Sequence, residues 1–216
     1  MIIRKFLHSC ILVEDKGKRL LIDPGLFSFI EDKIKPVDIG AVDMILLTHQ
    51  HADHYYPAAI KMFCEMKQAK IIADEEIGLL LSQEGLKHET IKANETKNIE
   101  GFEIKALEAP HGQIPTEIPH NLAFLINGTF LHPGDSFSVG GIEQCDIVAL
   151  PTFAPWARLV DALHFAQNLK PKKVIPIHDA FVKDFMLERM YGLSKILLEK
   201  NGIALHQLAL GEMLVI

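Results

Sequence analysis

Apolar and polar positions along this chain follow two patterns, one typical of buried strands and one typical of amphipathic helices. Short apolar runs bounded by polar residues predict strands buried on both faces. Apolar residues repeated every three or four positions predict helices that cover a core with one face. The predicted strands occupy residues 10–15, 18–24, 42–49, 69–74, 102–111, 121–128, 129–135, 145–151 and 172–179. The predicted helices occupy residues 57–67, 75–85, 156–169 and 185–202.

The two ends of the chain carry patterns typical of hairpins. Asp15-Lys16-Gly17 forms a plausible tight turn between the first two strands, and two short strands after residue 202 are expected to form a closing hairpin. Between the ends, strands alternate with helices. This order predicts an α/β fold with mixed sheets flanked by helices. Because no long linker or internal repeat interrupts the 216 residues, we expect a single domain over residues 1–216.

Composition and charge exclude several classes of function. The formal net charge is −6, and the longest basic cluster is the short run at residues 170–173, so we expect no binding to nucleic acid. Cys10, Cys64 and Cys145 are widely separated, which favours a reduced, cytoplasmic compartment. No apolar run approaches the roughly 18 residues of a membrane helix, so no membrane span is expected. A homo-oligomer is compatible with the sequence.

The most unusual stretch of the sequence is H-x-H-x-D-H, formed by His49, His51, Asp53 and His54 directly after a predicted strand. Imidazole nitrogen and carboxylate oxygen are good ligands for zinc, manganese and iron. A regular helix cannot present all four groups to one ion. A tight turn from strand to helix can direct His49 and His51 to one point and the other two side chains to another. That arrangement suits two ions about 3.5–4 Å apart, as in binuclear hydrolases.

Two ions need more ligands than these four, and three residues elsewhere are candidates. His111 lies between a proline and a glycine, Asp135 follows a glycine where a carboxylate could bridge both ions, and His178 ends a predicted strand. Like His49, each stands at or just past the end of an apolar run. Such positions let a rigid sheet assemble a site from distant parts of the chain.

These motifs resemble those of the metallo-β-lactamase superfamily. They are Thr48-His49-Gln50-His51-Ala52-Asp53-His54, Pro110-His111-Gly112, Gly134-Asp135-Ser136 and Pro176-Ile177-His178, with Asp23 after an early strand. The resemblance spans residues 8 to 178 and implies a four-layer αβ/βα sandwich of two mixed sheets flanked by helices. The site would lie along one edge of the sheets.

A narrower likeness is to the small metal-dependent hydrolases that include the ascorbate-6-phosphate lactonase and N-acyl-phosphatidylethanolamine phospholipase D types. Their opening strand carries G-H-S, where this chain has Leu7-His8-Ser9. The missing glycine departs from that pattern. Residues 151–156 also depart from it, because they stand where relatives often have a glycine-rich loop. Both departures concern the substrate pocket rather than the metal ligands.

The superfamily resemblance implies a role for each matching residue. His49, His51 and His111 would hold the first ion, Asp53, His54 and His178 the second, and Asp135 would bridge them. Asp23 would orient a ligand histidine. The narrower likeness implies that His8 stands at the mouth of the site, and the alternative is a strand residue with one satisfied hydrogen bond. His120, which precedes a predicted strand, is a candidate for substrate contact, and Trp156 can line the pocket or pack in the core.

This ligand set predicts a metal-dependent hydrolase acting on a small-molecule substrate. The expected cofactors are two divalent ions, zinc first, with manganese or iron as alternatives. A metal-activated hydroxide would attack an ester, lactone, amide or phosphodiester bond, and Asp53 and Asp135 would be the catalytic residues. Asp53 would relay a proton to the leaving group.

Two other functions fit the same ligands. One is a dioxygenase with a single iron, and the other is a non-catalytic metal-binding or sensing protein. A nuclease of the same superfamily is disfavoured because the chain lacks the length and the charge for a clamp domain.

Overall fold

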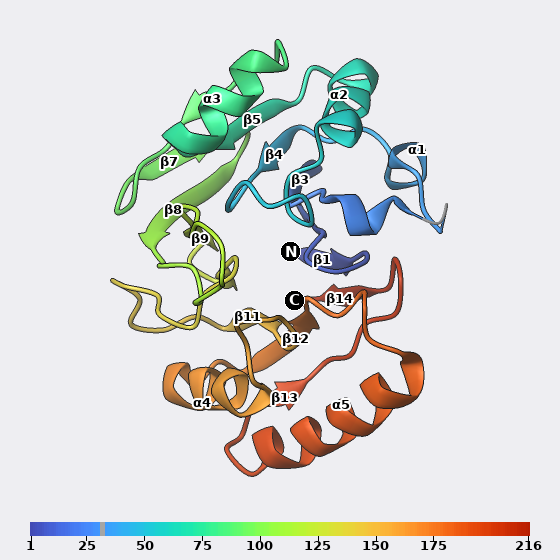
Figure 1. The fold of residues 1–216 in the computed structure, drawn as a ribbon, viewed down its shortest axis with the longest axis vertical. Helices are drawn as coiled ribbons and strands as arrows, with labels where there is room; N and C mark the ends of the chain where they lie inside the picture. Colours follow the sequence, from blue (N-terminus) through green and yellow to red (C-terminus); the bar gives the residue numbers. More distant parts are fainter. Residues whose placement is uncertain (31–32) are drawn as a thin grey trace.

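Two seven-stranded sheets pack face to face in the computed structural model of this protein, which describes residues 1–30 and 33–216 (Figure 1). The first sheet has the strand order β14 (Met213–Val215), β1 (Ile2–Lys5), β2 (Ile11–Asp15), β3 (Lys18–Ile22), β4 (Met44–Leu46), β5 (Lys70–Ala73) and β6 (Glu89–Thr90). The second has the order β13 (Ala204–Leu205), β12 (Lys173–Ile177), β11 (Ile147–Pro151), β10 (Phe130–His132), β9 (Leu122–Ile126), β8 (Phe102–Glu108) and β7 (Thr96–Ile99).

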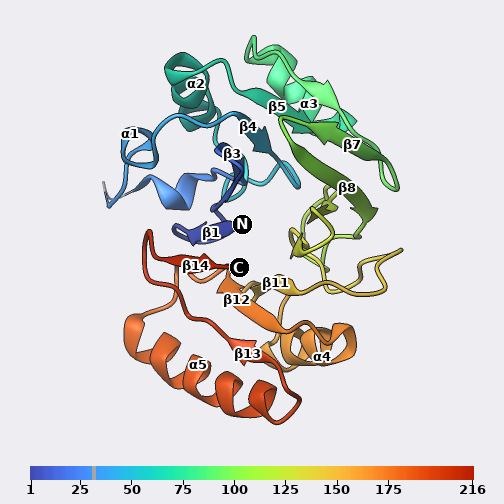
Figure 2. The same cartoon turned by 180° about the vertical axis from the view of Figure 1, so that it is seen from behind.

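Helices cover the outer face of each sheet, as the view from behind also shows (Figure 2). The helices are α1 (Pro36–Ile39), α2 (Pro57–Met66) and α3 (Glu75–Gln83) on the first sheet and α4 (Leu159–Leu169) and α5 (Asp184–Glu199) on the second, with a short 3₁₀ helix, η1, at Leu26–Ser28. Pro57 occupies the first turn of α2. Asp74 caps α3 by accepting a hydrogen bond from the Ile77 N–H at 2.9 Å. Local sequence therefore explains where these two helices begin.

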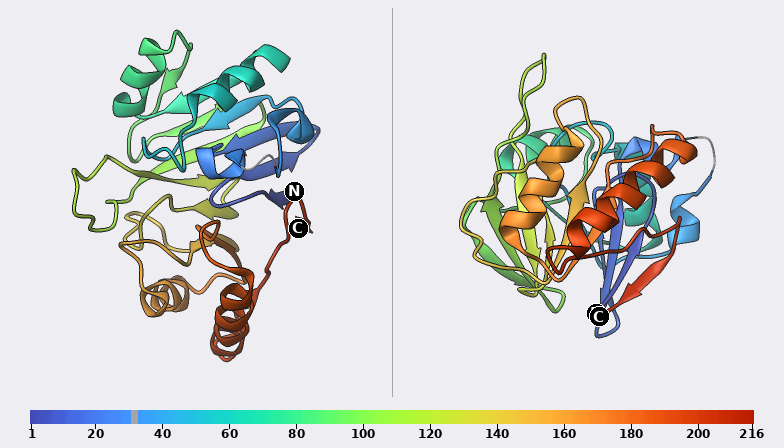
Figure 3. Two further views of the ribbon diagram at one scale, coloured as in Figure 1. Left: turned by 45° about the vertical axis from the view of Figure 1, so that its right-hand side comes forward. Right: turned by 90° about the horizontal axis from the view of Figure 1, so that it is seen from below.

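The layered arrangement explains why the strands are apolar on both faces. In β3, Leu20 and Ile22 belong to the core between the sheets, whereas Leu21 packs beneath the helices of the first sheet. In β11, Ala149 faces the central core and Leu150 faces the side covered by α4. The turned views separate the helical layers from the sheets (Figure 3). The predicted four-layer αβ/βα fold is confirmed.

Strand direction brings the carboxyl ends of many strands to one edge of each sheet. β3, β4 and β5 are parallel, and β1 runs the same way because β1 and β3 are both antiparallel to β2. In the second sheet β10, β11 and β12 are parallel, and β8 shares their direction through β9. Side chains that follow these strands in sequence therefore gather at the same edge, where open α/β sheets bind ligands.

Some predicted elements differ from the structure. The two closing strands do not form a hairpin: β13 pairs with β12 in the second sheet, while β14 pairs with β1 in the first. β14 thereby brings the two termini side by side (Figure 1). The sequence pattern also missed β1 and β7, and it began the fourth helix at Trp156 rather than Leu159. Periodicity identifies apolar segments, but it cannot name the strand that each one pairs with. Among the described residues, no helix combines the length and hydropathy needed to cross a lipid bilayer.

Asp43 ties the start of β4 to its neighbours. Its carboxylate accepts hydrogen bonds from the Arg19 backbone N–H at 2.9 Å, from Lys18 Nζ at 3.2 Å and from Lys67 Nζ at 2.7 Å. Burial alone would raise the pKa of Asp43, but Lys67 and the Arg19 N–H outweigh burial and lower it. The ionised carboxylate therefore stabilises the folded protein above the pKa of the unfolded chain, which is about 3.9.

Asp43→Asn should lower the free energy of unfolding at pH 7 by about 1–3 kcal/mol, because it weakens charge-assisted hydrogen bonds. The folded-state pKa is depressed, so the wild-type advantage should shrink as the pH falls through that pKa. Urea unfolding at several pH values measures this difference. Asp146→Asn, which affects an exposed ion pair with Lys172, is the control and should change stability by less than about 0.5 kcal/mol. A gap between wild type and Asp43→Asn that is independent of pH would contradict the assignment.

Candidate metal centre

Two groups of potential metal ligands lie at the sheet edge where these strands end. One group contains His49, His51, His111 and Asp135, and the other contains His8, Asp53, His54 and His178. Within each group the ligand atoms lie within 4.8 Å of one another. The structure thus brings together all seven predicted metal ligands, from the loops after β4, β8, β10 and β12, and adds His8 to the second group.

Hydrogen bonds orient four of the histidines in the same way. The Nδ1 atom of His54 lies 2.7 Å from Asp23 Oδ2, that of His111 lies 2.7 Å from the Gly112 carbonyl oxygen, and that of His49 lies 3.0 Å from Thr48 Oγ1. His178 Nδ1 donates to the carbonyl oxygen of Phe153. We assign the proton to Nδ1 from these partners. Each Nε2 then points toward the common site, where a cation would displace any proton it carries; that of His49 lies 3.1 Å from His51 Nδ1.

Asp135 lies between the two groups. Its Oδ1 is 3.1 Å from His54 Nε2, and its Oδ2 is 3.2 Å from His178 Nε2 and 3.5 Å from His111 Nε2. One carboxylate therefore faces histidines of both groups. This is the geometry that a carboxylate bridging two ions requires, and Asp135 is almost fully buried.

Several buried polar atoms at this point make no hydrogen bond of acceptable geometry among the described residues, although they lie 3.1 to 3.5 Å from one another. They are the Nε2 atoms of His54, His111 and His178 and the Oδ1 atom of Asp135. A buried polar atom without a partner costs free energy, so native proteins rarely leave several of them together. These atoms converge on one another, and imidazole nitrogen with carboxylate oxygen is a donor set that suits zinc, manganese and iron. The residues present fit a divalent metal site.

The electrostatics of the site favour positive charge among the imidazoles. Burial alone would lower the pKa of His178, but Asp135 outweighs burial and raises it to about 9. Burial also opposes charge on His54, yet Asp135, Asp23 and Asp53 raise its pKa well above the ordinary value. Burial would raise the pKa of Asp135, but His54 and His178 hold it well below its usual range. The carboxylates therefore stay ionised and stabilise a cation at this position.

His8 lies inside the protein and does not stand at the mouth of the site as expected, because its side chain is fully buried. The Ala180 N–H donates to His8 Nδ1 at 3.4 Å, which leaves the proton on Nε2. His8 Nε2 then donates to Asp53 Oδ2 at 3.0 Å. Burial lowers the pKa of His8 to about 4, so the ring is neutral at pH 7. In this tautomer His8 orients Asp53 and offers no lone pair to a metal.

Asp23 and Thr48 support the histidine-rich turn from below. Asp23 accepts hydrogen bonds from the Thr48 N–H at 2.9 Å and from Thr48 Oγ1 at 2.7 Å, besides its contact with His54. Asp23 therefore lies where a carboxylate can orient a ligand histidine, as expected, while the part played by Thr48 was not predicted. The position of Thr48 directly before His49 in the sequence was the available signal.

Three residues at the site adopt the left-handed backbone conformation, which is unfavourable for residues other than glycine. They are His8, Asp23 and His178, with φ values of 60°, 49° and 64°. The backbone around them is fixed by hydrogen bonds, for example from the His178 N–H to the His8 carbonyl oxygen at 3.2 Å. A buried ion pair between Lys5 Nζ and Asp179 at 2.9 Å holds the same loop. These contacts hold the three residues in conformations that direct their side chains toward the site.

Trp156 makes a contact that the sequence did not reveal. Its Nε1–H donates to Asp135 Oδ2 at 2.8 Å, and its ring covers Gly112, where an added Cβ would lie 2.3 Å from the indole. The tryptophan therefore touches the carboxylate shared by the two groups. The sequence offered only the choice between a pocket wall and a core residue.

His120, a candidate for substrate contact, lies away from both groups. Its Nδ1 contacts Asp74, its backbone N–H donates to Glu76 Oε2 at 3.0 Å, and its side chain is 45% exposed. Together with Asp74 and Glu76 it lines a separate cavity near α3. His132, by contrast, is buried beside the Asp135 turn, and its Nδ1 accepts the Gly134 N–H at 3.3 Å.

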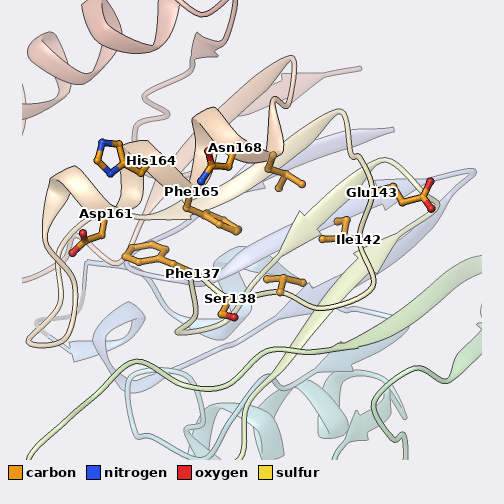
Figure 4. Close-up of a pocket in the computed structure, with 10 residues that line it drawn as sticks. Phe137, Ser138, Ile142, Glu143, Asp161, His164, Phe165 and Asn168 are labelled. Carbon is orange, nitrogen blue, oxygen red and sulfur yellow. The ribbon is translucent and has the colours of Figure 1, made fainter.

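Two further cavities differ in whether they reach the candidate ligands. One, of about 520 Å³, lies beside α4 and is lined by Phe137, Glu143, Asp161 and His164 among others (Figure 4). None of its described lining residues belongs to either ligand group. A second cavity, of about 690 Å³, includes Asp53 and His178 in its wall. Because it reaches candidate ligands, it is the cavity in which a substrate can meet the metal centre.

Comparisons with known proteins identify the family. A family model described as a beta-lactamase superfamily domain matches residues 2–178. The chain is 31% identical over 185 residues to the Mycobacterium tuberculosis protein Rv0786c. This match covers 82% of this chain and 83% of that protein. It is 30% identical over 193 residues to a UPF0173 metal-dependent hydrolase of Bacillus velezensis. This second match covers 79% of this chain and 82% of the relative.

A solved structure has the same fold. Igni18, a metallo hydrolase from the archaeon Ignicoccus hospitalis, superimposes with a TM-score of 0.76 at 22% identity, over 99% of this chain and 98% of that one. The chain belongs to the β-lactamase superfamily domain family and, within it, to the UPF0173 metal-dependent hydrolases. The predicted superfamily and the prediction of a metal-dependent hydrolase are confirmed at this level. The narrower likeness to lactonase and phospholipase types stays a prediction.

Gly25 allows the chain that follows β3 to pass directly against the histidine-rich turn. A Cβ added at Gly25 would lie 1.7 Å from the Asp53 carbonyl oxygen and 2.5 Å from the His54 nitrogen. Gly25→Ala should therefore displace this turn, destabilise the fold by about 1–3 kcal/mol and reduce metal binding. Thermal unfolding and metal titration measure the two effects.

Gly192→Ala is the matched control for this substitution. An added Cβ at Gly192 meets nothing within 4 Å in α5, so this variant should gain up to about 1 kcal/mol from helix propensity. Its metal binding should equal that of the wild type. Normal metal binding and stability in Gly25→Ala would show that the contact does not hold the turn.

Proposed function

We propose that this protein uses two divalent metal ions, zinc first, to hydrolyse an ester, lactone, amide or phosphodiester bond of a small molecule. The observation that carries the proposal is the convergence of the unpartnered Nε2 atoms of His54, His111 and His178 on Asp135. Manganese and iron fit the same donors. Membership of a family of metal-dependent hydrolases supports the reaction class.

The proposed ligand sets follow the two groups, with one change. His49, His51 and His111 hold the first ion, Asp53, His54 and His178 hold the second, and Asp135 bridges them. His8 belongs geometrically to the second group, but its Nε2 carries the proton donated to Asp53. We therefore assign His8 to the orientation of Asp53 rather than to metal binding.

Bound divalent ions supply Lewis acidity, which lowers the pKa of water and polarises the substrate oxygen. The protein side chains position the groups around them. Asp53 Oδ2 accepts a hydrogen bond from His8 and faces the substrate cavity, so its carboxylate can pass a proton to the leaving group. Trp156 holds one oxygen of Asp135, and Asp23 with Thr48 holds the imidazoles of His49 and His54.

We infer a cytoplasmic enzyme that acts on a small molecule and does not bind nucleic acid. The net charge of −6 supports the absence of nucleic-acid binding, since proteins that bind nucleic acid usually present a basic surface to its backbone.

His51→Ala should remove most of the bound metal and leave the fold largely intact, because the His51 side chain lies at the partly exposed end of its group. Elemental analysis of the purified protein, with circular dichroism for folding, measures both. His164→Ala, at an exposed histidine on α4, is the matched control and should retain the wild-type metal content. Equal metal content in the two variants would refute the ligand assignment.

Removal of metal with a chelator should abolish hydrolysis of ester, lactone and phosphodiester substrates, and added zinc or manganese should restore it. Oxygen consumption is measured in parallel with iron-loaded protein. Substrate-dependent oxygen uptake without hydrolysis would favour the dioxygenase alternative. Stoichiometric metal without turnover of any substrate class would favour a metal-binding or sensing protein.

Trp156→Phe should weaken metal affinity or lower the rate by about tenfold, because it removes the hydrogen bond to Asp135 while retaining an aromatic ring over Gly112. Competition with a chelating dye measures the affinity. Phe137→Leu, which alters a ring 4.9 Å from that of Trp156, should leave the affinity close to that of the wild type. Identical affinity and rate in Trp156→Phe would remove the positioning role of the indole.

A further inference from the structure

The cavity beside the metal centre is almost entirely apolar. It has a volume of about 690 Å³, within the range of small-molecule sites. Its lining residues are Phe27, Ala52, Asp53, Phe153, Ala154, Pro155, Ala157, His178, Phe181 and Val182. Only Asp53 and His178 among them are ionisable, and both belong to the candidate metal centre. The reacting group of a substrate would therefore lie at the polar end of the cavity, and the rest of the substrate would contact apolar side chains.

The charges of this cavity disfavour anionic substrates. No lysine or arginine is among its described lining residues. The carboxylate of Asp53, which is 21% exposed, is the one acidic group among the described lining residues. A charged group in the part of the cavity away from the metal centre would lose its hydration without gaining a cationic side chain. An uncharged apolar group pays no such cost and gains by leaving water.

Aromatic rings form the outer wall of the cavity. Phe181 follows β12 and is 53% exposed, so part of its ring faces solvent at the edge of the cavity. Its ring lies 6.4 Å from that of Phe27, which in turn lies 5.0 Å from the His8 ring. The two phenylalanines thus line a path from solvent to the second ligand group, and an apolar substrate would cover the exposed ring.

We propose that this site hydrolyses uncharged carboxylic esters, lactones included, whose apolar chain packs against Phe27, Phe153 and Phe181. The proposal rests on the metal-dependent hydrolysis proposed above. In the reaction the oxygen of water bonds to the acyl carbon, and the acyl C–O bond breaks. One proton of the water passes to the alcohol oxygen, so that an acid and an alcohol are formed. Phe27 and Phe181 act as specificity-determining residues, because they contact the chain rather than the reacting atoms.

Chain-length series measured with the zinc-loaded, full-length protein test this proposal. One series consists of p-nitrophenyl acetate, butyrate and hexanoate, and the other consists of the acetates of ethanol, butanol and hexanol, followed by acid release. In at least one series kcat/KM should rise by up to about fourfold for each added CH2 that enters the cavity. p-Nitrophenyl hemisuccinate, which ends in a carboxylate, should react at least about tenfold more slowly than the butyrate ester. Bis(p-nitrophenyl) phosphate should also be a poor substrate.

The double variant Phe27→Ala, Phe181→Ala assigns the preference to this cavity. It should flatten the dependence on chain length, measured as the ratio of kcat/KM for the longest ester to that for the shortest, a ratio that a uniform loss of activity leaves unchanged. Phe185→Ala is the matched control, because Phe185 is a 67% exposed phenylalanine that does not line the cavity. This variant should keep the wild-type slope. A slope that persists in the double variant would overturn the assignment of the cavity.

The outcomes separate this proposal from the one on which it rests. Chelator-sensitive hydrolysis that is independent of chain length in both series, or faster on the hemisuccinate or the phosphodiester, overturns the ester proposal and leaves the metal-dependent hydrolase standing. If zinc-loaded protein hydrolyses none of the esters, lactones or phosphodiesters, both proposals fail. Faster hydrolysis of longer neutral esters, lost in the double variant and retained in Phe185→Ala, supports both.

Discussion

The carboxylate of Asp135 is the interaction on which the rest of the site depends. Its two oxygens face His54, His111 and His178, which come from both ligand groups, and the indole of Trp156 holds one of them. A carboxylate this deeply buried is unfavourable unless positive charge surrounds it. The imidazoles and the cations they can bind meet that requirement. The buried charge and the metal site are therefore two aspects of one electrostatic arrangement.

The layered fold provides the rigidity that this arrangement needs. Each sheet is buried on both faces, so the strands that carry the site residues cannot shift without disturbing two packed layers. The left-handed conformations of His8, Asp23 and His178 are retained because hydrogen bonds and the ion pair of Lys5 with Asp179 fix the loops around them. The apolar wall of Phe27 and Phe181 lies against the same loops, which links substrate selection to the metal centre.

Sequence reasoning succeeded where the signal was local. Residues 44–47 and 147–151 are apolar throughout, and both contain strands buried between layers. The spacing of His49, His51, Asp53 and His54 indicated a turn with two directions, and those side chains do divide between two groups. It failed where the answer lay in distant packing. His120 and His8 both lie in loops next to strands, yet only His8 reaches the site. The closing strands join different sheets for the same reason, since their partners are chosen across the molecule.

The sequence by itself determined the class of fold, the family and the set of donor atoms, because periodicity, turn chemistry and motif spacing are written within a few neighbouring residues. The tertiary structure alone decided which donors meet. It buried His8 beside Asp53 with its proton on Nε2 and directed the Trp156 N–H to Asp135. It also left a largely apolar cavity beside the ligands. These contacts join residues up to 172 positions apart, so strand order and the backbone conformation of single residues set them, and no local pattern encodes either.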